Sequence, residues 1–205
     1  RLFRDRGYST LLIDLQAHGE SLGDAITVGY VERHDVRAAV DYVRNQTPDH
    51  RIAIVGRSLG GAATILASPE IDALVIESVY PTVAEAVHNR VEMRVGPLHH
   101  LVAPLLLIQL KPRLGISPHE LRPIEQLGSI QCPVLVAVGD VDQHTPLEES
   151  QRMFDAANEP KSLVVFQGAG HEDLLAYDPE KYESEIVAFV EDALKTRFGD
   201  ILTKK

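Results

Sequence analysis

Cysteine and tryptophan are almost absent from this sequence of 205 residues, which has one cysteine, Cys132, and no tryptophan. A single cysteine cannot form an internal disulfide, and it cannot supply the several thiolates of a cysteine-based metal site. The sequence therefore carries no mark of its redox compartment. We expect Cys132 to be a small, buried, apolar residue.

Basic residues are also few. The chain has 20 Lys and Arg against 30 Asp and Glu, which gives a net charge of -10 at pH 7. Such a charge repels phosphate backbones and anionic membrane surfaces at long range. We therefore expect a small, uncharged substrate and no nucleic-acid partner.

Long apolar runs are missing as well. The longest nearly apolar run covers residues 101–110 and contains Pro104, whereas a membrane-spanning helix needs about 20 residues. We expect the visible chain to lie outside the membrane, in the cytoplasm. It begins at Arg1, inside a helical pattern over residues 1–6, and we expect further residues to precede it in the native protein.

The chain is rich in apolar residues, and strand-like runs alternate along it with helical patterns. Hydrophobic residues make up 44% of it, which is enough for one domain with one core. Helical patterns separate short aliphatic runs, which predict strands at 9–14, 51–55, 71–76, 133–138 and 162–166. Continuous apolar strands that alternate with helices indicate an α/β fold, with a parallel sheet covered on both faces.

One segment breaks this alternation. Residues 81–126, between the third and fourth predicted strands, are rich in Leu, Pro and His. We interpret them as a helical insertion, a cap or lid over the carboxyl ends of the strands, where parallel sheets form their sites. The predicted organisation is one domain over 1–205 that carries this cap.

The pattern G-x-S-x-G occurs at residues 56–60 (GRSLG), where an apolar strand ends and a helix of small residues begins. This context favours a tight turn that exposes the hydroxyl of Ser58 over an ordinary strand-to-helix turn. We expect Gly56 and Gly60 where backbone packs against backbone and leaves no room for a Cβ atom. The N–H of Leu59, at the amino end of the helix, is the nearest donor for a developing oxyanion.

A serine hydroxyl needs a base to remove its proton. His171 follows the fifth predicted strand directly, in the glycine-containing loop 168–173 (GAGHED), and is the candidate base. A solvated or structurally hydrogen-bonded imidazole is the simpler interpretation of His18, His34, His50, His88, His99, His100 and His119.

The base in turn needs a carboxylate to orient it. Residues 139–146 (GDVDQHTP) follow the fourth predicted strand and offer Asp140 and Asp142, which position alone does not separate. Glu77, just after the third predicted strand, is a weaker rival because it would have to reach across a neighbouring strand. Residues 145–148 (TPLE) also predict a capping box at the start of the next helix.

These segments resemble the α/β-hydrolase superfamily over nearly the whole chain. Residues 13–21 (IDLQAHGES) are similar to the family loop D-x-R-G-H-G-x-S, with Gln16 and Ala17 in place of Arg-Gly, and 168–171 fit the terminal G-x-G-H. The chain order of serine, acid and histidine is that of the family. Its G-x-x-D-x-x-x-P pattern places the acid at Asp142. Within the superfamily, the sequence resembles the bacterial hydrolases grouped with serine aminopeptidase-like and Bem46-like proteins.

The resemblance implies an α/β-hydrolase fold and cleavage of an ester, amide or thioester through an acyl-enzyme, without a metal or organic cofactor. Ser58 would be the nucleophile, His171 the base and Asp142 the acid. It also implies that a strand and a loop with the second oxyanion donor precede Arg1. Without them, we expect the 205 residues to fold poorly and to be nearly inactive.

The fold analogy does not transfer a substrate. A small acyl ester is our leading expectation. A peptidase or amidase is the alternative within the enzyme class, and acidic cap residues such as Glu85 and Glu92 would favour it by binding a substrate amine. A ligand-binding protein on a hydrolase scaffold is the alternative from another class.

Overall fold

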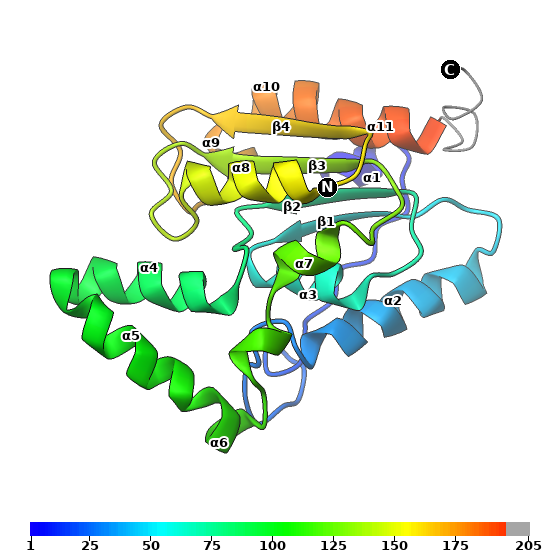
Figure 1. Ribbon diagram of the computed structural model, residues 1–205. Helices are drawn as coiled ribbons and strands as arrows, with labels where there is room; N and C mark the ends of the chain where they lie inside the picture. Colours follow the sequence, from blue (N-terminus) through cyan, green and yellow to red (C-terminus); the bar gives the residue numbers. More distant parts are fainter. Residues whose placement is uncertain (196–205) are drawn as a thin grey trace.

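The computed structural model describes residues 1–195, and its centre is a sheet of parallel strands in the order β1-β2-β3-β4 (Figure 1). The strands are β1 (Ala53–Arg57), β2 (Ala73–Glu77), β3 (Val134–Gly139) and β4 (Lys161–Phe166). In the ladder Val55 pairs with Val75, and Val75 pairs with Leu135. The predicted α/β fold with a parallel sheet is confirmed, and four of the predicted strands lie within two residues of their expected starts.

Helices cover both faces of the sheet. Besides the helices of the insertion described below, they are α1 (Leu2–Asp5), α2 (Glu32–Gln46), α3 (Leu59–Ala67), α8 (Leu147–Ala156), α9 (Leu174–Tyr177), α10 (Pro179–Lys181), a π-helical stretch (Tyr182–Val187) and α11 (Ala188–Lys195). α2, α3 and α8 pack on one face, and the run from α10 to α11 packs on the other.

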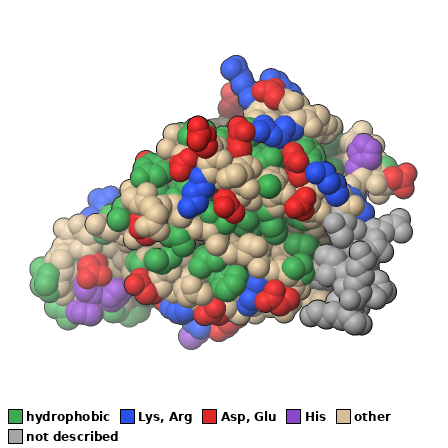
Figure 2. Space-filling view, turned by 90° about the horizontal axis from the view of Figure 1, so that it is seen from above, with side chains coloured by type: hydrophobic (Ala, Val, Ile, Leu, Met, Phe, Trp, Pro, Cys, Tyr) green, Lys and Arg blue, Asp and Glu red, His purple; other side chains and the backbone are tan. Residues whose placement is uncertain are grey.

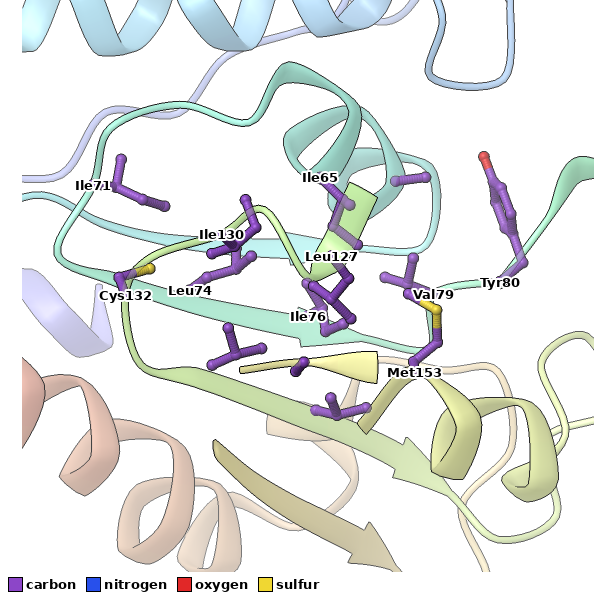
Figure 3. Close-up of a cluster of buried hydrophobic side chains, with 14 of the residues drawn as sticks. Ile65, Ile71, Leu74, Ile76, Val79, Tyr80, Leu127, Ile130, Cys132 and Met153 are labelled. Carbon is purple, nitrogen blue, oxygen red and sulfur yellow. The ribbon is translucent and has the colours of Figure 1, made fainter. Parts of the chain in front are cut away.

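The strands supply side chains to both layers because successive residues of a strand point to opposite faces. Leu74 and Ile76 of β2 join the core under α3 and α8, with Ile65 and Met153 (Figure 3). Val75, between them in sequence, joins the second core under the C-terminal helices. This double burial explains why the strands are continuous apolar runs.

Cys132 lies at the edge of the first core, where its side chain is 4% exposed. Burial raises the pKa of its thiol to about 12. The expectation of a small, buried, apolar cysteine is confirmed, and the thiol is held in its protonated, unreactive form.

The strand predicted at residues 9–14 is not formed, and this prediction was wrong. The segment is exposed, with Leu12 at 93% exposure. A strand exists only through hydrogen bonds to a neighbour, and no strand of residues 1–195 pairs with this segment. β1 is consequently an edge strand of the described sheet, and its Val55 is 39% exposed.

The insertion between β2 and β3 is helical, as predicted. It consists of α4 (Val83–Val95), a 3₁₀ turn (Gly96–Leu98), α5 (His99–Ile108), α6 (Leu110–Leu114), a second 3₁₀ turn (Pro118–Glu120) and α7 (Pro123–Leu127). α4 and α5 form a V that projects from the layered body (Figure 1). α7 belongs with the body instead, because its Leu127 is fully buried in the core under α3 and α8.

An 18-residue window within the helical stretch Val83–Leu114 has a mean hydropathy of 1.2, so this stretch is long and apolar enough to count as a candidate membrane-crossing segment. A single stretch of this kind is weak evidence for a membrane protein. The chain changes direction within it at Gly96, whose φ is +57°. The V of α4 and α5 is therefore two short helices, and α5 with 10 residues is only about 15 Å long.

Candidate active site

Ser58 lies between the end of β1 at Arg57 and the start of α3 at Leu59. Its backbone angles are φ +48° and ψ -117°, a conformation that costs a non-glycine residue about 1–3 kcal/mol. A hydrogen bond of 2.8 Å from the Ser58 N–H to the Glu77 carbonyl helps to hold the turn. This strained strand-to-helix turn presents the serine side chain at the carboxyl end of the strand.

The glycines around the turn have unequal roles. A Cβ on Gly56 would come 2.7 Å from the Cα of Gly61, and a Cβ on Gly61 would come 2.6 Å from the Gly56 carbonyl oxygen. These two glycines let α3 pack closely on β1. A Cβ on Gly60 would meet nothing within 4 Å, so the expectation that Gly60 lies at a backbone contact was wrong. Gly60 lies in the first turn of α3 on its open side.

This difference predicts unequal effects of alanine at the two positions. Gly61→Ala is expected to lower the free energy of unfolding by about 1–3 kcal/mol, because the added methyl overpacks the contact between β1 and α3. Gly60→Ala should change it by less than about 1 kcal/mol, and in the stabilising direction, because alanine is the better helix former. Urea unfolding of both variants checks this, and equal losses would contradict it.

The structure brings Ser58, His171 and Asp142 into one hydrogen-bonded chain. His171 Nε2 lies 3.2 Å from Ser58 Oγ, and His171 Nδ1 lies 2.8 Å from Asp142 Oδ2. His171 comes from the loop between β4 and α9, and Asp142 from the loop between β3 and α8. The three residues thus come from the carboxyl ends of three parallel strands, where such sheets place their sites.

Asp142 is almost completely buried, at 3% exposure, and all its contacts favour the carboxylate form. Its Oδ1 accepts hydrogen bonds from the N–H groups of His144 (2.8 Å) and Thr145 (3.0 Å), and its Oδ2 accepts one from the Thr145 hydroxyl (2.8 Å). Burial alone would raise the pKa of Asp142, but the bonds from His171 and Thr145 outweigh it and lower the pKa to about 2. A carboxylate that is ionised at neutral pH favours the Nδ1–H tautomer of His171, which leaves Nε2 free to accept a proton.

The lowered pKa makes a prediction about acid stability. The carboxyl of an unfolded aspartate has a pKa of about 3.9, so the stabilisation from Asp142 is complete above pH 5 and is lost as the pH falls toward 2. The full contribution is about 2 kcal/mol, and about 1 kcal/mol of it should disappear between pH 5 and pH 3. Urea unfolding of the wild type and Asp142→Asn should show their difference shrinking by this amount. A difference that is constant with pH would contradict the assignment.

The other two candidate carboxylates have different partners. Asp140 Oδ1 accepts a hydrogen bond of 2.5 Å from the Gly168 N–H, so Asp140 braces the loop that carries His171. Glu77 is 5% exposed and accepts a hydrogen bond of 2.6 Å from the Tyr182 hydroxyl. Burial raises the pKa of Glu77. Neither carboxylate is within hydrogen-bond distance of His171.

Three residues that sequence reasoning missed support this arrangement. Thr145 does not cap α8, whose N-cap is Pro146, and the predicted capping box is absent because the threonine hydroxyl is directed to Asp142. The ring of His144 lies 4.7 Å from that of His171. Burial, followed by the charges of His171 and Arg90, lowers the pKa of His144. Arg57 Nη2 donates to the His171 carbonyl at 3.1 Å, which ties the histidine loop to the end of β1.

The N–H of Leu59 lies beside the serine as the first of α3. The first N–H groups of a helix have no acceptor within it, and the Ser58 side chain does not cap this one. The amino end of α3 therefore presents donors and a positive dipole next to Ser58 Oγ. The chemical set at this edge of the sheet is a serine hydroxyl, a base, an ionised acid and an N–H donor.

Comparison with known proteins gives a family match over residues 1–185, to a family described as the alpha/beta hydrolase family. The uncharacterized protein Rv2307c of Mycobacterium tuberculosis is 34% identical over 173 residues, which cover 82% of this chain and 54% of that protein. The uncharacterized protein YqkD of Bacillus subtilis is 24% identical over 198 residues, which cover 93% of this chain and 65% of that one. The chain thus spans between about half and two thirds of the length of these curated relatives.

Among solved structures, the esterase Pf2001 of Pyrococcus furiosus is similar to this fold with a TM-score of 0.69 and 23% sequence identity. The similarity covers 88% of this chain and 69% of the esterase. At this level of identity, the likeness establishes the shared fold.

Proposed function

This chain belongs to the alpha/beta hydrolase family, and on that premise we propose that it is a serine hydrolase that cleaves small, uncharged carboxylic esters through an acyl-enzyme. The observation that carries the proposal is the hydrogen-bonded chain from Ser58 through His171 to Asp142, at 3.2 Å and 2.8 Å. In this chain the Asp142 carboxylate can orient the imidazole of His171, and the imidazole can accept the proton of the Ser58 hydroxyl.

The proposed reaction proceeds in two transfers of the acyl group. Ser58 Oγ attacks the ester carbonyl while its proton moves to His171 Nε2, and the imidazolium that forms is stabilised by the Asp142 carboxylate. The carbonyl oxygen becomes an oxyanion, to which the Leu59 N–H donates. His171 then returns the proton to the leaving alcohol. Water, deprotonated by His171, then attacks the acyl-serine. As the bond from the acyl carbon to Ser58 Oγ breaks, His171 returns the proton to Oγ and the carboxylic acid is released.

An uncharged ester is favoured over anionic substrates by the net charge of -10, which repels anions. An ester is also the bond named for the solved structural neighbour, which is an esterase. The peptidase alternative depended on free acidic groups in the insertion. Of the two acidic residues named for this role, Glu85 pairs with Arg152 at 2.5 Å and accepts a hydrogen bond from the Thr82 hydroxyl, so its charge is already compensated. Glu92 is exposed on α4.

The V of α4 and α5 is proposed to be the cap of the site, within the insertion 81–126. The strands point their carboxyl ends toward the side from which the V projects (Figure 1). α4 also contacts the loop between β3 and α8 that carries Asp142 (the acid loop), because Asn89 Nδ2 donates to the His144 carbonyl at 3.2 Å. Exposed apolar residues of the 3₁₀ turn and α5 would give this cap an apolar surface for acyl groups. These residues are Leu98, Leu101, Leu105 and Ile108.

The test is stopped-flow hydrolysis of p-nitrophenyl acetate, butyrate and octanoate. An acyl-enzyme mechanism predicts an initial burst of p-nitrophenol, up to one equivalent of protein when deacylation is slower than acylation. The matching p-nitroanilides separate the alternatives, because a peptidase or amidase would cleave them at comparable rates. Binding of the esters without any turnover would instead support a ligand-binding protein on a hydrolase scaffold.

A further inference from the structure

Three histidines from the two helices of the V lie against one another. His88 lies on α4, and His99 and His100 begin α5. The ring centroid of His99 is 4.1 Å from that of His88 and 3.8 Å from that of His100. Figure 2 shows histidine side chains gathered at this end of the molecule. Their ring nitrogens include a set of three that lie within 4.8 Å of one another.

The hydrogen bonds leave these nitrogens available. His99 is 5% exposed, and its Nδ1 is 2.8 Å from the Gly96 carbonyl oxygen, to which it must donate. That bond keeps the proton of the neutral ring on Nδ1, so Nε2 carries a lone pair. The carbonyl acts on His99 in the same way as the hydrogen-bond acceptor that commonly orients a metal-bound histidine. Within residues 1–195, the rings of His88 and His100 make no hydrogen bond. Three imidazoles thus converge, and each has a nitrogen free to act as a ligand.

We propose that His88, His99 and His100 bind a divalent transition-metal ion, with Zn²⁺ the best match. Imidazole is a preferred ligand of zinc, and zinc–nitrogen bonds are about 2.0–2.1 Å long. Tetrahedral bonds of that length set the nitrogens about 3.4 Å apart. One ring nitrogen from each histidine now lies within 4.8 Å of the other two, so side-chain rotation must bring the nitrogens closer together around the ion. His100 is exposed, so the fourth position opens to water.

The charge and the location fit this role. The net charge of -10 draws cations to the protein. The site joins the last turns of α4 to the first turn of α5 across Gly96, which is the corner of the V. α4 is also tied to the acid loop by Asn89, which donates to Glu149 at 2.7 Å as well as to the His144 carbonyl. A metal at the corner fixes α5 relative to α4 and thereby fixes the shape of the cap. This inference is independent of the proposed ester hydrolysis.

The experiment is metal titration of the EDTA-treated protein. Co²⁺, as a spectroscopic substitute for Zn²⁺, should give the visible absorption of a four-coordinate ion at one equivalent, and excess Zn²⁺ should abolish it. Zn²⁺ should also raise the melting temperature, whereas Mg²⁺, which prefers oxygen ligands, should not. Loss of a group that only orients a metal ligand typically weakens binding about 10- to 100-fold. His100 is proposed as a direct ligand, so His100→Gln should weaken binding of both metals by at least that factor.

Matched variants identify the site. His119→Gln removes an exposed histidine elsewhere in the insertion and should leave the affinity unchanged. His171→Gln removes the histidine beside Ser58 and should also leave it unchanged. Because the His100 side chain is exposed, His100→Gln should fold normally, and its melting temperature without metal verifies this. Equal affinity of the wild type and His100→Gln, or loss of binding in His171→Gln alone, would overturn the proposal.

Discussion

Ser58→Ala is expected to lower the turnover of p-nitrophenyl esters by on the order of 10⁶-fold, the loss seen when the nucleophile of a comparable triad is removed. The reason is that the variant has no atom that can form the acyl bond, while His171 and Asp142 keep their mutual contact of 2.8 Å. Loss of the nucleophile and loss of the base overlap because both act in one step. His171→Ala should therefore have a similar effect, and the double variant should be little worse than either single one.

Stability should hardly change in Ser58→Ala. Within residues 1–195 the hydroxyl is hydrogen-bonded only to His171, at 3.2 Å, and the backbone bond from the Ser58 N–H to the Glu77 carbonyl is retained. Ser162→Ala is the matched control, because Ser162 is an exposed residue of the edge strand β4. It should have wild-type turnover. Turnover by Ser58→Ala near the wild-type rate, with an unchanged melting temperature, would exclude Ser58 as the nucleophile.

Asp142→Asn is expected to lower kcat by up to about 10⁴-fold. An asparagine amide that faces His171 Nδ1 can donate a hydrogen bond to it, which stabilises the tautomer with its proton on Nε2. That tautomer cannot accept the proton of Ser58. The substitution also replaces the carboxylate that accepts hydrogen bonds from the Thr145 hydroxyl and from two backbone N–H groups. The side chain at position 142, and with it the imidazole, is therefore held less firmly.

Asp140→Asn is the control for this prediction, because both aspartates lie in the same loop. Asp140 accepts from the Gly168 N–H, and an asparagine oxygen can still do so. We expect a loss of less than about 10-fold in kcat. Steady-state kinetics of the two variants at pH 8 measure the ranking, and a larger loss in Asp140→Asn would show that the acid is misassigned.

The sequence predicts those parts of the fold that depend on local patterns. β2 and β3 are recognisable because both faces of a central parallel strand are buried, which requires continuous apolar residues such as 73–76 and 134–138. α3 is recognisable because two glycines and two alanines follow Leu59 in a row. The candidate residues Ser58 and His171 follow apolar strands directly, so the parallel topology alone brings them to one edge of the sheet.

What the sequence does not predict depends on distant partners. Residues 9–14 have the composition of a strand, but strand formation needs a neighbour that composition does not reveal. The Thr145 hydroxyl has two uses, capping α8 or donating to Asp142, and the second prevails because it satisfies a buried carboxylate. Which glycine lies at the contact of β1 and α3 depends on the helix phase, and that phase selects Gly61 over Gly60.

The histidines of the V illustrate the same limit. His99 and His100 are adjacent in the sequence, but His88 joins them only because the chain reverses direction at Gly96 with a positive φ. Individually, each is typical of an ordinary surface or structural imidazole. Their convergence appears only in three dimensions, and so does the chemistry that we infer from it.

The most direct test of the central claim is labelling with a fluorophosphonate probe, followed by mass spectrometry of the labelled peptide. Only a serine activated by a neighbouring base reacts readily with such a probe. The account predicts one phosphonylated residue, Ser58, with labelling lost in Ser58→Ala and strongly slowed in His171→Ala. An unlabelled folded protein, or a label on another serine that persists in Ser58→Ala, would contradict it.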